Sequence, residues 1–342
     1  MNPRITQSFL EAYTGLNEAQ KQAVETIDGP VLVIAGPGTG KTQILAARIG
    51  NILLKTDARP ENILCLTYTD AGTVAMRKRL LQFIGPDAYK VGIFTFHAFC
   101  NMVIQENLDH FGIKDLQPIS ELEQKQLLEK LIDNFGKDHL LKRWTGEIYY
   151  DSYRLQKLFQ LMKTENWTVE KIHEEANRYI AELPDKDEFR YKRANAAKGI
   201  KVGDLKRDKI DAEIKKMNEL KAAASEFTNY ENMMRELKRY DYDDMIIWVL
   251  KAFEEHPYML LRYQERYQYF LVDEFQDTNG SQNAILKSLI TNDFNEGKPN
   301  VLVVGDDDQS IYRFQGANVQ NIMDFWFDYK EQITTIVMTE NY

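Results

Sequence analysis

The sequence predicts an α/β fold with a parallel β-sheet. Two separated parts of the chain form this sheet, and an all-α domain is inserted between them. Five short apolar runs are typical of buried strands, whereas residues 107–251 show long, charged segments of helical period. A glycine-rich loop follows the first strand, as in proteins that bind phosphate groups. We therefore expect one sheet domain formed by residues 1–106 and 252–342. The predicted strands are residues 31–34, 63–66, 91–95, 267–272 and 301–304.

The composition is that of an ordinary globular chain. Its 342 residues suggest about two domains, and 44% hydrophobic residues suffice for a large core. The net charge of -9 argues against binding nucleic acid by bulk charge alone, so any such site must be local. The sequence has no signal peptide and no apolar run of membrane-spanning length, and we expect a soluble, cytoplasmic protein. Cys65 and Cys100 lie in apolar segments, which favours buried reduced thiols over a disulfide or metal site.

A short helix is predicted to begin just before the first strand, in the segment LNEAQ. Asn17 is its expected N-cap, and Gln20 stands three residues later. Gln20 is either the capping-box partner of Asn17 or a reader of an adenine edge, because an amide can donate and accept at once. The residues alone favour neither interpretation.

The segment VLVIAGPGTGKT is the one around which the rest of the chain is organised. An aliphatic strand enters a loop whose glycines can adopt backbone angles that other residues avoid, and a helical pattern follows. Helix N-terminal N–H groups, the Lys41 ammonium and the Thr42 hydroxyl would then converge on phosphate groups and a magnesium ion. The strand before and the helix after distinguish this loop from a chance glycine-rich turn. The expected nucleotide-binding residues are Ala35, which replaces the first glycine of the template, Gly36, Pro37, Gly38, Thr39, Gly40, Lys41 and Thr42.

Two residues follow the second and third predicted strands at the edge where open α/β sheets bind ligands. Tyr68 is flanked by threonines and an aspartate, so its ring can project into a groove and stack on a base, although an aromatic residue at a strand end usually belongs to the core. His97 follows the third strand, and a histidine there is more often structural than a ligand.

The middle of the chain is predicted to be helical. Ser120 and Glu123 form a capping box, and residues 151–163 and 168–183 have amphipathic helical spacing. Residues 186–207 are rich in lysine and arginine, and we favour a solvated loop over a nucleic-acid contact surface there.

Asp273 and Glu274 end the fourth predicted strand. In a protein with a phosphate loop, one such carboxylate can hold magnesium while the other orients or deprotonates the attacking water. A cap in an exposed loop is the weaker alternative, because a charged pair after six largely apolar residues needs partners when it is buried. Gln309 follows the fifth strand, where its amide can report a γ-phosphate, and the aromatic Phe314 is close to it in sequence.

Taken in order, these motifs resemble the superfamily 1 helicases of the UvrD/Rep/PcrA type over nearly the whole chain. The matching strings are LNEAQ, GPGTGKT, TYTDAG, TFH, LVDEFQDT and VGDDDQSIYRFQGA, with YDYDDMI in the helical middle. The resemblance implies a RecA-like P-loop NTPase fold with ATP and Mg²⁺ as cofactors. It also implies a DNA helicase that moves 3′ to 5′ on single-stranded DNA and unwinds duplex junctions.

The resemblance also implies a role for each candidate residue. Lys41 binds the β- and γ-phosphates, Glu274 is the catalytic base, and Gln309 couples the γ-phosphate to the DNA site. Gln20 contacts adenine, while Thr42 and Asp273 hold magnesium. The positions expected to contact single-stranded DNA are Tyr68, Thr95, His97 and Phe314.

Four positions depart from the family pattern. Asp70 stands where these enzymes usually have asparagine, which puts negative charge near the expected DNA path. Gln43 replaces a frequent arginine after the Lys-Thr pair. Phe314 and Gln315 replace a common Trp-Arg pair, so a stacking face remains without its guanidinium unless Arg313 substitutes.

The last residues, TENY, resemble the start of a family motif of the form NYR. Its tyrosine, here Tyr342, is expected to stack on adenine, and its arginine is not present. We therefore expect an N-terminal portion of a longer helicase, without the second RecA-like domain and with low hydrolysis by itself.

Two other functions compete with the helicase. One is a phosphate-loop ATPase that acts as a DNA-binding switch or clamp without unwinding. The other is a non-catalytic interaction subunit, which would be expected to lose Lys41, Asp273 or Glu274, and all three are present. The aromatic residues Tyr68 and Phe314 favour the motor over the switch.

Overall fold

The computed structural model describes residues 5–112, 115–194, 201–292, 295, 297–306 and 319–340, with only the backbone described at 319 and 320. The chain divides into two compact units. We call Met1–Gly112 with Met245–Tyr342 the sheet unit, and Ile113–Asp244 the helical unit. These boundaries differ from the predicted ones after residues 106 and 251. The ring of Phe99 packs on Tyr263 and Tyr267, and Phe253 packs on Tyr263, so the helices on both sides of the insertion belong to the sheet unit.

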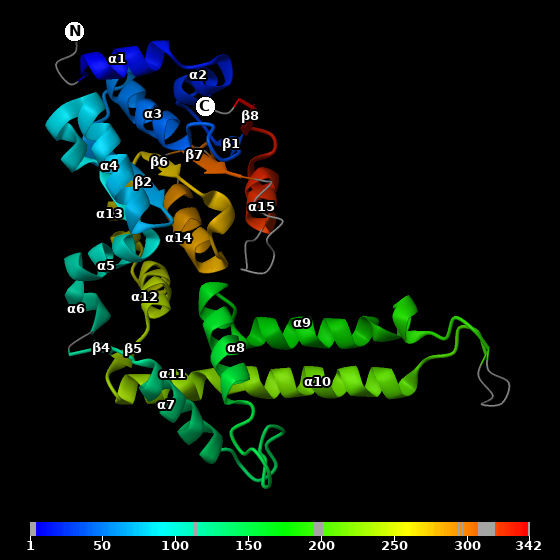
Figure 1. Cartoon of the computed structure of the whole chain (residues 1–342). Helices are drawn as coiled ribbons and strands as arrows, with labels where there is room; N and C mark the ends of the chain where they lie inside the picture. The colour runs from blue at the N-terminus through cyan, green and yellow to red at the C-terminus, as the bar shows by residue number, and fades with distance from the viewer. Residues whose placement is uncertain are drawn as a thin grey trace. The chain divides into compact units, whose positions relative to one another are not determined.

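The described strands of the sheet unit form one six-stranded parallel sheet with the order β3-β2-β6-β7-β1-β8. This confirms the predicted α/β fold with a parallel sheet. Figure 1 labels β1, β2, β6, β7 and β8 of this sheet. The strands are β1 (Val31–Ala35), β2 (Ile63–Thr67), β3 (Gly92–Thr95), β6 (Tyr269–Val272), β7 (Val301–Gly305) and β8 (Thr334–Met338).

Helices and short 3-10 turns connect these strands and cover the sheet. The α-helices are α1 (Gln7–Thr14), α2 (Glu18–Glu25), α3 (Lys41–Lys55), α4 (Asp70–Ile84), α5 (Phe96–Glu106), α6 (Leu108–Phe111), α12 (Tyr242–Glu255, in this unit from Met245), α13 (Pro257–Arg266), α14 (Gly280–Ile290) and α15 (Val319–Tyr329). The 3-10 turns are η1 (Pro60–Asn62), η2 (Gly85–Lys90) and η6 (Phe275–Asp277).

The five strands predicted from apolar runs are all present, and the register places their carboxyl ends at one edge. Thr67 pairs with Thr95, Leu66 with Val272, and Ile34 with Gly305. The sixth strand, β8, was not predicted. It lies at the sheet edge and alternates buried and exposed side chains, so it lacks the uninterrupted buried run by which the others were recognised.

One face of the sheet packs against α1 to α4. Val31 and Val33 of β1 share this core with Ile44 of α3 and with Met76 and Leu80 of α4. Both cysteines are free and buried, as predicted, and burial raises the pKa of each thiol.

A buried arginine of α3 ties that helix to the end of α2. Arg48 donates hydrogen bonds to the carbonyl oxygens of Ala23 (2.7 Å), Ile27 (3.1 Å) and Thr26. Burial lowers the pKa of Arg48 to about 10. Because the guanidinium is satisfied by three carbonyls, its burial fixes the helix that begins at the glycine-rich loop.

The helical unit contains the predicted amphipathic helices. Ser120 and Glu123 form the predicted capping box, and the two amphipathic segments are α8 and α9. The prediction of an all-α insertion missed two short parallel strands, which hold its ends together. The elements are β4 (Gln117–Pro118), α7 (Glu121–Asp133), α8 (Ser152–Thr164), α9 (Val169–Glu182), η3 (Leu183–Asp185), η4 (Asp187–Phe189), α10 (Arg207–Ser225), α11 (Phe227–Glu236) and β5 (Arg239–Tyr240).

The basic segment 186–207 is described except for residues 195–200. It is more ordered than a simple solvated loop, because Phe189 is buried with Leu183 and Ile210 and a β-bridge joins Arg190 to Leu205. No helix within the described residues is long and apolar enough to cross a membrane.

A buried cluster of charges lies within the helical unit. The Lys163 ammonium is 2.6 Å from Oδ2 of Asp241 and 2.6 Å from Oδ1 of Asp244. Burial alone would lower the pKa of Lys163, but the charges of the two carboxylates outweigh it and raise that pKa. Burial raises the pKa of Asp244 to about 6, although Lys163 opposes the shift. This cluster joins α8 to the start of α12.

Candidate active site

The glycine-rich loop between β1 and α3 is held open by its own backbone. Gly38 and Gly40 have φ of 81° and 86°, the left-handed region that favours glycine. A Cβ on Gly40 would also lie only 3.3 Å from Nε2 of Gln20. The Thr39 hydroxyl is turned inward and donates to the Gly36 carbonyl oxygen at 2.8 Å. The loop therefore presents its backbone, not its side chains, at the end of the strand.

The first turn of α3 follows this loop at once. The helix begins at Lys41, and its N-cap Gly40 supplies no side-chain hydrogen bond. The leading N–H groups of a helix have no acceptor within the helix, and the helix dipole makes that end positive. The start of α3 therefore offers backbone donors suited to an anion.

Gln20 is the capping-box partner of Asn17. Its Oε1 accepts from the Asn17 N–H at 3.1 Å, and its own N–H donates to Asn17 Oδ1 at 2.8 Å. Its Nε2 donates to the Thr39 carbonyl oxygen at 3.0 Å, so the side chain also ties α2 to the loop. One amide hydrogen has no bond among these contacts, and the adenine contact stays a prediction.

The acidic pair after β6 meets the lysine of the loop. Lys41 Nζ lies 2.8 Å from Glu274 Oε2, and the lysine side chain is only 11% exposed. Glu274 itself has a φ of 50°, an uncommon value for a residue with a side chain. Such strained conformations collect at functional sites, where surrounding contacts hold them.

Asp273 is buried beside this ion pair. Burial, and then the negative charge of Glu274, raise the pKa of Asp273 to about 6, although Lys41 opposes the shift. Its Oδ1 accepts the Glu274 N–H at 3.0 Å. A carboxylate made costly to ionise in this way is stabilised by a cation, which fits a magnesium ligand.

The few metal-binding side chains near Lys41 fit magnesium better than a metal that takes all its ligands from the protein. No group of three or more His, Cys, Asp or Glu side chains that could hold a metal ion occurs in the described part of the chain. Magnesium commonly uses one or two protein ligands together with water and substrate phosphates. Asp273, with the half-buried Thr42 at the start of α3, matches that pattern.

Gln276 is a site residue that the sequence analysis missed. It is fully buried, and its Nε2 donates to Glu274 Oε2 at 2.8 Å and to Asp277 Oδ2 at 3.3 Å. Its Oε1 accepts the Asp306 N–H at 3.0 Å, directly after β7. The side chain therefore links Glu274 to the neighbouring strand end. Its position in the string LVDEFQDT was the only available signal, and nothing in that string indicates which way the amide points.

The residues expected to contact DNA follow β2 and β3. Tyr68 is exposed between β2 and α4, and His97 is half-buried in the first turn of α5. Thr95 is buried, and its hydroxyl oxygen accepts the Ala98 N–H at 3.2 Å as the N-cap of α5. Because Thr67 pairs with Thr95, all three positions lie at one sheet edge. Thr95 caps a helix here, and its DNA contact stays a prediction.

Similarity to known proteins decides the family. The family model described as UvrD/REP helicase N-terminal domain matches residues 16–330. The chain belongs to the UvrD/REP helicase family. This confirms the resemblance inferred from the motifs.

Relatives of this UvrD/REP chain include proteins named ATP-dependent DNA helicase PcrA. The one from Staphylococcus epidermidis is 30% identical over 328 residues, and the one from Staphylococcus aureus is 29% identical over 328 residues. Each match covers 96% of this chain and 38% of the relative. The chain therefore spans about two fifths of the length of these curated relatives.

Some predicted site residues of this UvrD/REP chain, and some residues of its departures from the family pattern, lie outside the described residues. These are Gln309, Arg313, Phe314, Gln315 and Tyr342. Asp70, a departure from the family pattern, is exposed in the first turn of α4, directly after the N-cap Thr69. A negative charge there is favourable to the helix dipole. Gln43, the other described departure, is half-buried and its N–H donates to the Gly40 carbonyl oxygen at 2.9 Å.

Proposed function

We propose that this chain binds ATP and magnesium at the loop between β1 and α3 and hydrolyses the nucleotide there. In the whole protein, hydrolysis drives 3′ to 5′ movement along single-stranded DNA and unwinding at duplex junctions. The observation that carries the proposal is the 2.8 Å ion pair between Lys41 Nζ and Glu274 Oε2. It joins the lysine of a phosphate loop to an acid at the end of β6, and the names of the relatives support a DNA helicase.

The loop residues would bind the phosphates, and Lys41 would turn from Glu274 to the β- and γ-phosphate oxygens. Thr42 and Asp273 would hold the magnesium ion, which when bound withdraws negative charge from the phosphates. Gln20 and Tyr342 are proposed to contact the adenine. This assignment is supported by the buried position of Asp273 and by the open donor array at the start of α3.

Glu274 is proposed as the general base. Once Lys41 has turned to the phosphates, the Glu274 carboxylate no longer pairs with a cation and can take a proton from the attacking water. Gln276 would keep the carboxylate in place, because its hydrogen bond to Oε2 does not depend on Lys41. The proposed base must keep this orientation, because it can take a proton only from a water molecule within hydrogen-bond reach.

DNA would bind at the same sheet edge, on the side of β2 and β3. Tyr68, Thr95, His97 and Phe314 are the proposed contacts, with base stacking on the aromatic rings. Gln309, after β7, would couple the γ-phosphate to this surface. The strand order supports the proposal, because β6 lies between β2 and β7.

Measuring ATP hydrolysis with and without a single-stranded oligonucleotide tests the proposal. We expect the oligonucleotide to accelerate hydrolysis by the whole protein, and Lys41→Ala to weaken nucleotide binding and abolish turnover. The matched control is Lys55→Ala, an exposed lysine at the far end of α3. Hydrolysis that persists in Lys41→Ala would contradict the site, and hydrolysis indifferent to DNA would contradict the coupling. Strand separation on 3′-tailed but not 5′-tailed duplexes by the whole protein separates a motor from a switch or clamp.

A further inference from the structure

The segment from the end of α7 to the start of α8 exposes an unusual number of large side chains. Trp144 and Tyr153 are each 63% exposed. Large apolar side chains exposed together in one segment mark interaction sites more often than singly scattered ones. The exposed large side chains of the segment are Leu140, Trp144, Ile148, Tyr149, Tyr150 and Tyr153.

Positive charges lie against the rings of this segment. Lys142 Nζ is 5.5 Å from the ring centroid of Trp144, and Lys157 Nζ is 4.8 Å from that of Tyr153. The guanidinium carbons of Arg143 and Arg154 lie 4.2 and 5.0 Å from the ring centroid of Tyr150. Aromatic rings interleaved with cations are typical of surfaces that bind nucleic acid.

A buried carboxylate organises these cations. Asp151 accepts from Arg143 Nε at 3.1 Å and from Arg154 Nη1 at 3.4 Å. The two arginine side chains remain 43% and 65% exposed, so part of each guanidinium faces solvent. Because both arginines meet at Tyr150 and Asp151, their sequence neighbours Trp144 and Tyr153 flank one cluster.

The local charge opposes that of the whole chain. Residues 137–157 contain five Lys or Arg and three Asp or Glu, one of them the buried Asp151, in a chain of net charge -9. A polyanion would therefore find here a locally positive surface with exposed rings.

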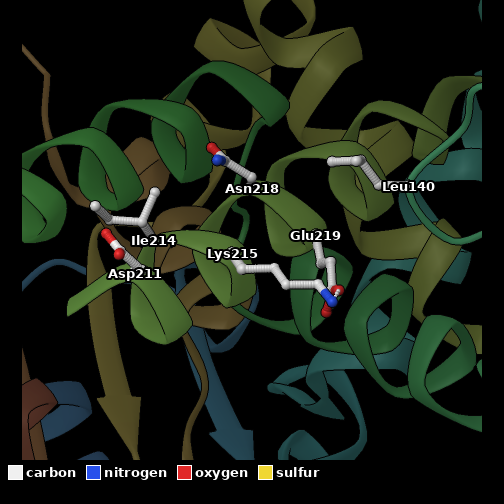
Figure 2. A pocket seen from close by; sticks show the side chains of 6 residues that line it. All are labelled: Leu140, Asp211, Ile214, Lys215, Asn218 and Glu219. Carbon is white, nitrogen blue, oxygen red and sulfur yellow. Dashed lines mark ion pairs between the residues drawn. The ribbon is translucent and has the colours of Figure 1, made fainter. Parts of the chain in front are cut away.

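The hollow beside Leu140 does not share these properties. It has a volume of about 460 Å³ and is lined by Leu140, Asp211, Ile214, Lys215, Asn218 and Glu219. Figure 2 shows Lys215 and Glu219 turned toward one another, and their charged atoms are 3.9 Å apart. With no aromatic lining and its cation already paired, this pocket is not part of the surface we assign.

We propose that Trp144, Tyr153, Arg143 and Arg154 form a binding surface for single-stranded nucleic acid on the helical unit. Bases stack on the two exposed rings, and the solvent-facing parts of the two guanidiniums contact phosphates. Its residues are different ones from the DNA candidates after β2 and β3. The inference rests on the proposed function for its substrate class, but binding here needs neither ATP nor hydrolysis.

The test is the affinity of the complete chain for a fluorescently labelled single-stranded oligonucleotide, measured by anisotropy without nucleotide. Trp144→Ala and Tyr153→Ala are each expected to weaken binding by roughly fivefold or more, and Trp144→Phe and Tyr153→Phe to retain most of it. Arg143→Gln with Arg154→Gln should flatten the salt dependence. The matched control is Tyr258→Ala in the sheet unit, at an exposed tyrosine, which should leave the affinity unchanged.

Unchanged affinity in both alanine variants, an equal loss in Tyr258→Ala, or tighter binding of a blunt duplex of the same length would overturn the inference. Unchanged affinity would favour a protein partner for the exposed rings. A failure of the proposed function would give a different result: Lys41→Ala would hydrolyse ATP as fast as the parent. That result does not depend on the affinity for the oligonucleotide.

Discussion

Glu274 accepts hydrogen bonds from two side chains, Lys41 and Gln276, each at 2.8 Å. The lysine is the partner that nucleotide would remove, whereas the amide is held from its other end by the Asp306 N–H. Gln276 is therefore a positioning residue for the proposed base. Its side chain also links the end of β6 to the end of β7, because it bonds both Glu274 and the Asp306 N–H. A movement at one strand end would therefore act on the other through Gln276.

Replacing Gln276 should separate positioning from binding. In Gln276→Ala, Glu274 loses the contact that orients it, and we expect kcat to fall about tenfold or more while nucleotide affinity changes little. The matched control is Gln264→Ala, which removes an amide that bonds carbonyl oxygens at the end of α14, away from Glu274. Steady-state hydrolysis with separate kcat and KM values checks this. A rise in KM at unchanged kcat would assign Gln276 to substrate binding instead.

Asp273 should make stability depend on pH. Its pKa is raised to about 6, so between about pH 4 and 6 the folded state holds a proton that the unfolded state has lost. The free energy of unfolding therefore falls as pH rises through this window. Asp273→Asn removes the cost of the buried charge, and we expect a gain of about 1 to 3 kcal/mol at pH 7 with little change near pH 4. The same variant should lose magnesium-dependent hydrolysis.

Urea unfolding at the two pH values measures this effect, without magnesium or nucleotide. Equal effects of Asp273→Asn at pH 4 and pH 7, or a loss of stability at pH 7, would show that burial does not penalise the Asp273 charge. The comparison is made within one variant, so general effects of the substitution cancel.

At the scale of elements, the sequence predicted best what repeats along the chain. Uninterrupted apolar runs indicated five strands, and N-cap signals indicated the starts of α2 and α7. The edge strand β8 was not predicted, because alternating exposed and buried residues are a weaker strand signal than an uninterrupted apolar run. Arg48 was not predicted because all three carbonyl groups that it contacts lie more than 20 residues away in sequence. Gln276 was not predicted because the bond from the Asp306 N–H, which shows its link to β7, spans 30 residues.

The Lys163 cluster tests how the helical unit holds α8 to the start of α12. Lys163→Met removes the only cation in contact with Asp241 and Asp244 among the ion pairs described, and leaves a buried and a half-buried carboxylate without it. Removing that charge should raise the pKa of Asp244 further above its present value of about 6. We expect a loss of about 3 to 5 kcal/mol at pH 8 and a smaller loss at pH 5, where the carboxylate can protonate.

Chemical unfolding of Lys163→Met at pH 5 and pH 8, followed by circular dichroism, checks the prediction. Lys157→Met is the matched control, since that lysine is on the same helix and contacts the Tyr153 ring instead of a carboxylate. A loss of the same size at both pH values would mean that lost packing, and not stranded charge, destabilises the variant.

At the scale of the whole chain, the strand order explains how one sheet edge can serve two ligands. The nucleotide candidates follow β1, β7 and β6, and the described DNA candidates follow β2 and β3, next to β6. The motifs predicted this sharing of one edge, because parallel strands end together. They could not predict where the insertion begins, since α5, α6 and most of α12 are helical in sequence but belong to the sheet unit.

The central claim is that Lys41 and Glu274 form an ATP-hydrolysing site, and the Glu274→Gln variant tests it most directly. Binding of a fluorescent ATP analogue and hydrolysis of ATP with magnesium and single-stranded DNA are measured on the parent and the variant. The amide keeps the size of the side chain but cannot take a proton from water, so we predict binding within about threefold of the parent and a loss of turnover of about a hundredfold or more. Comparable hydrolysis by Glu274→Gln and the parent would contradict the account.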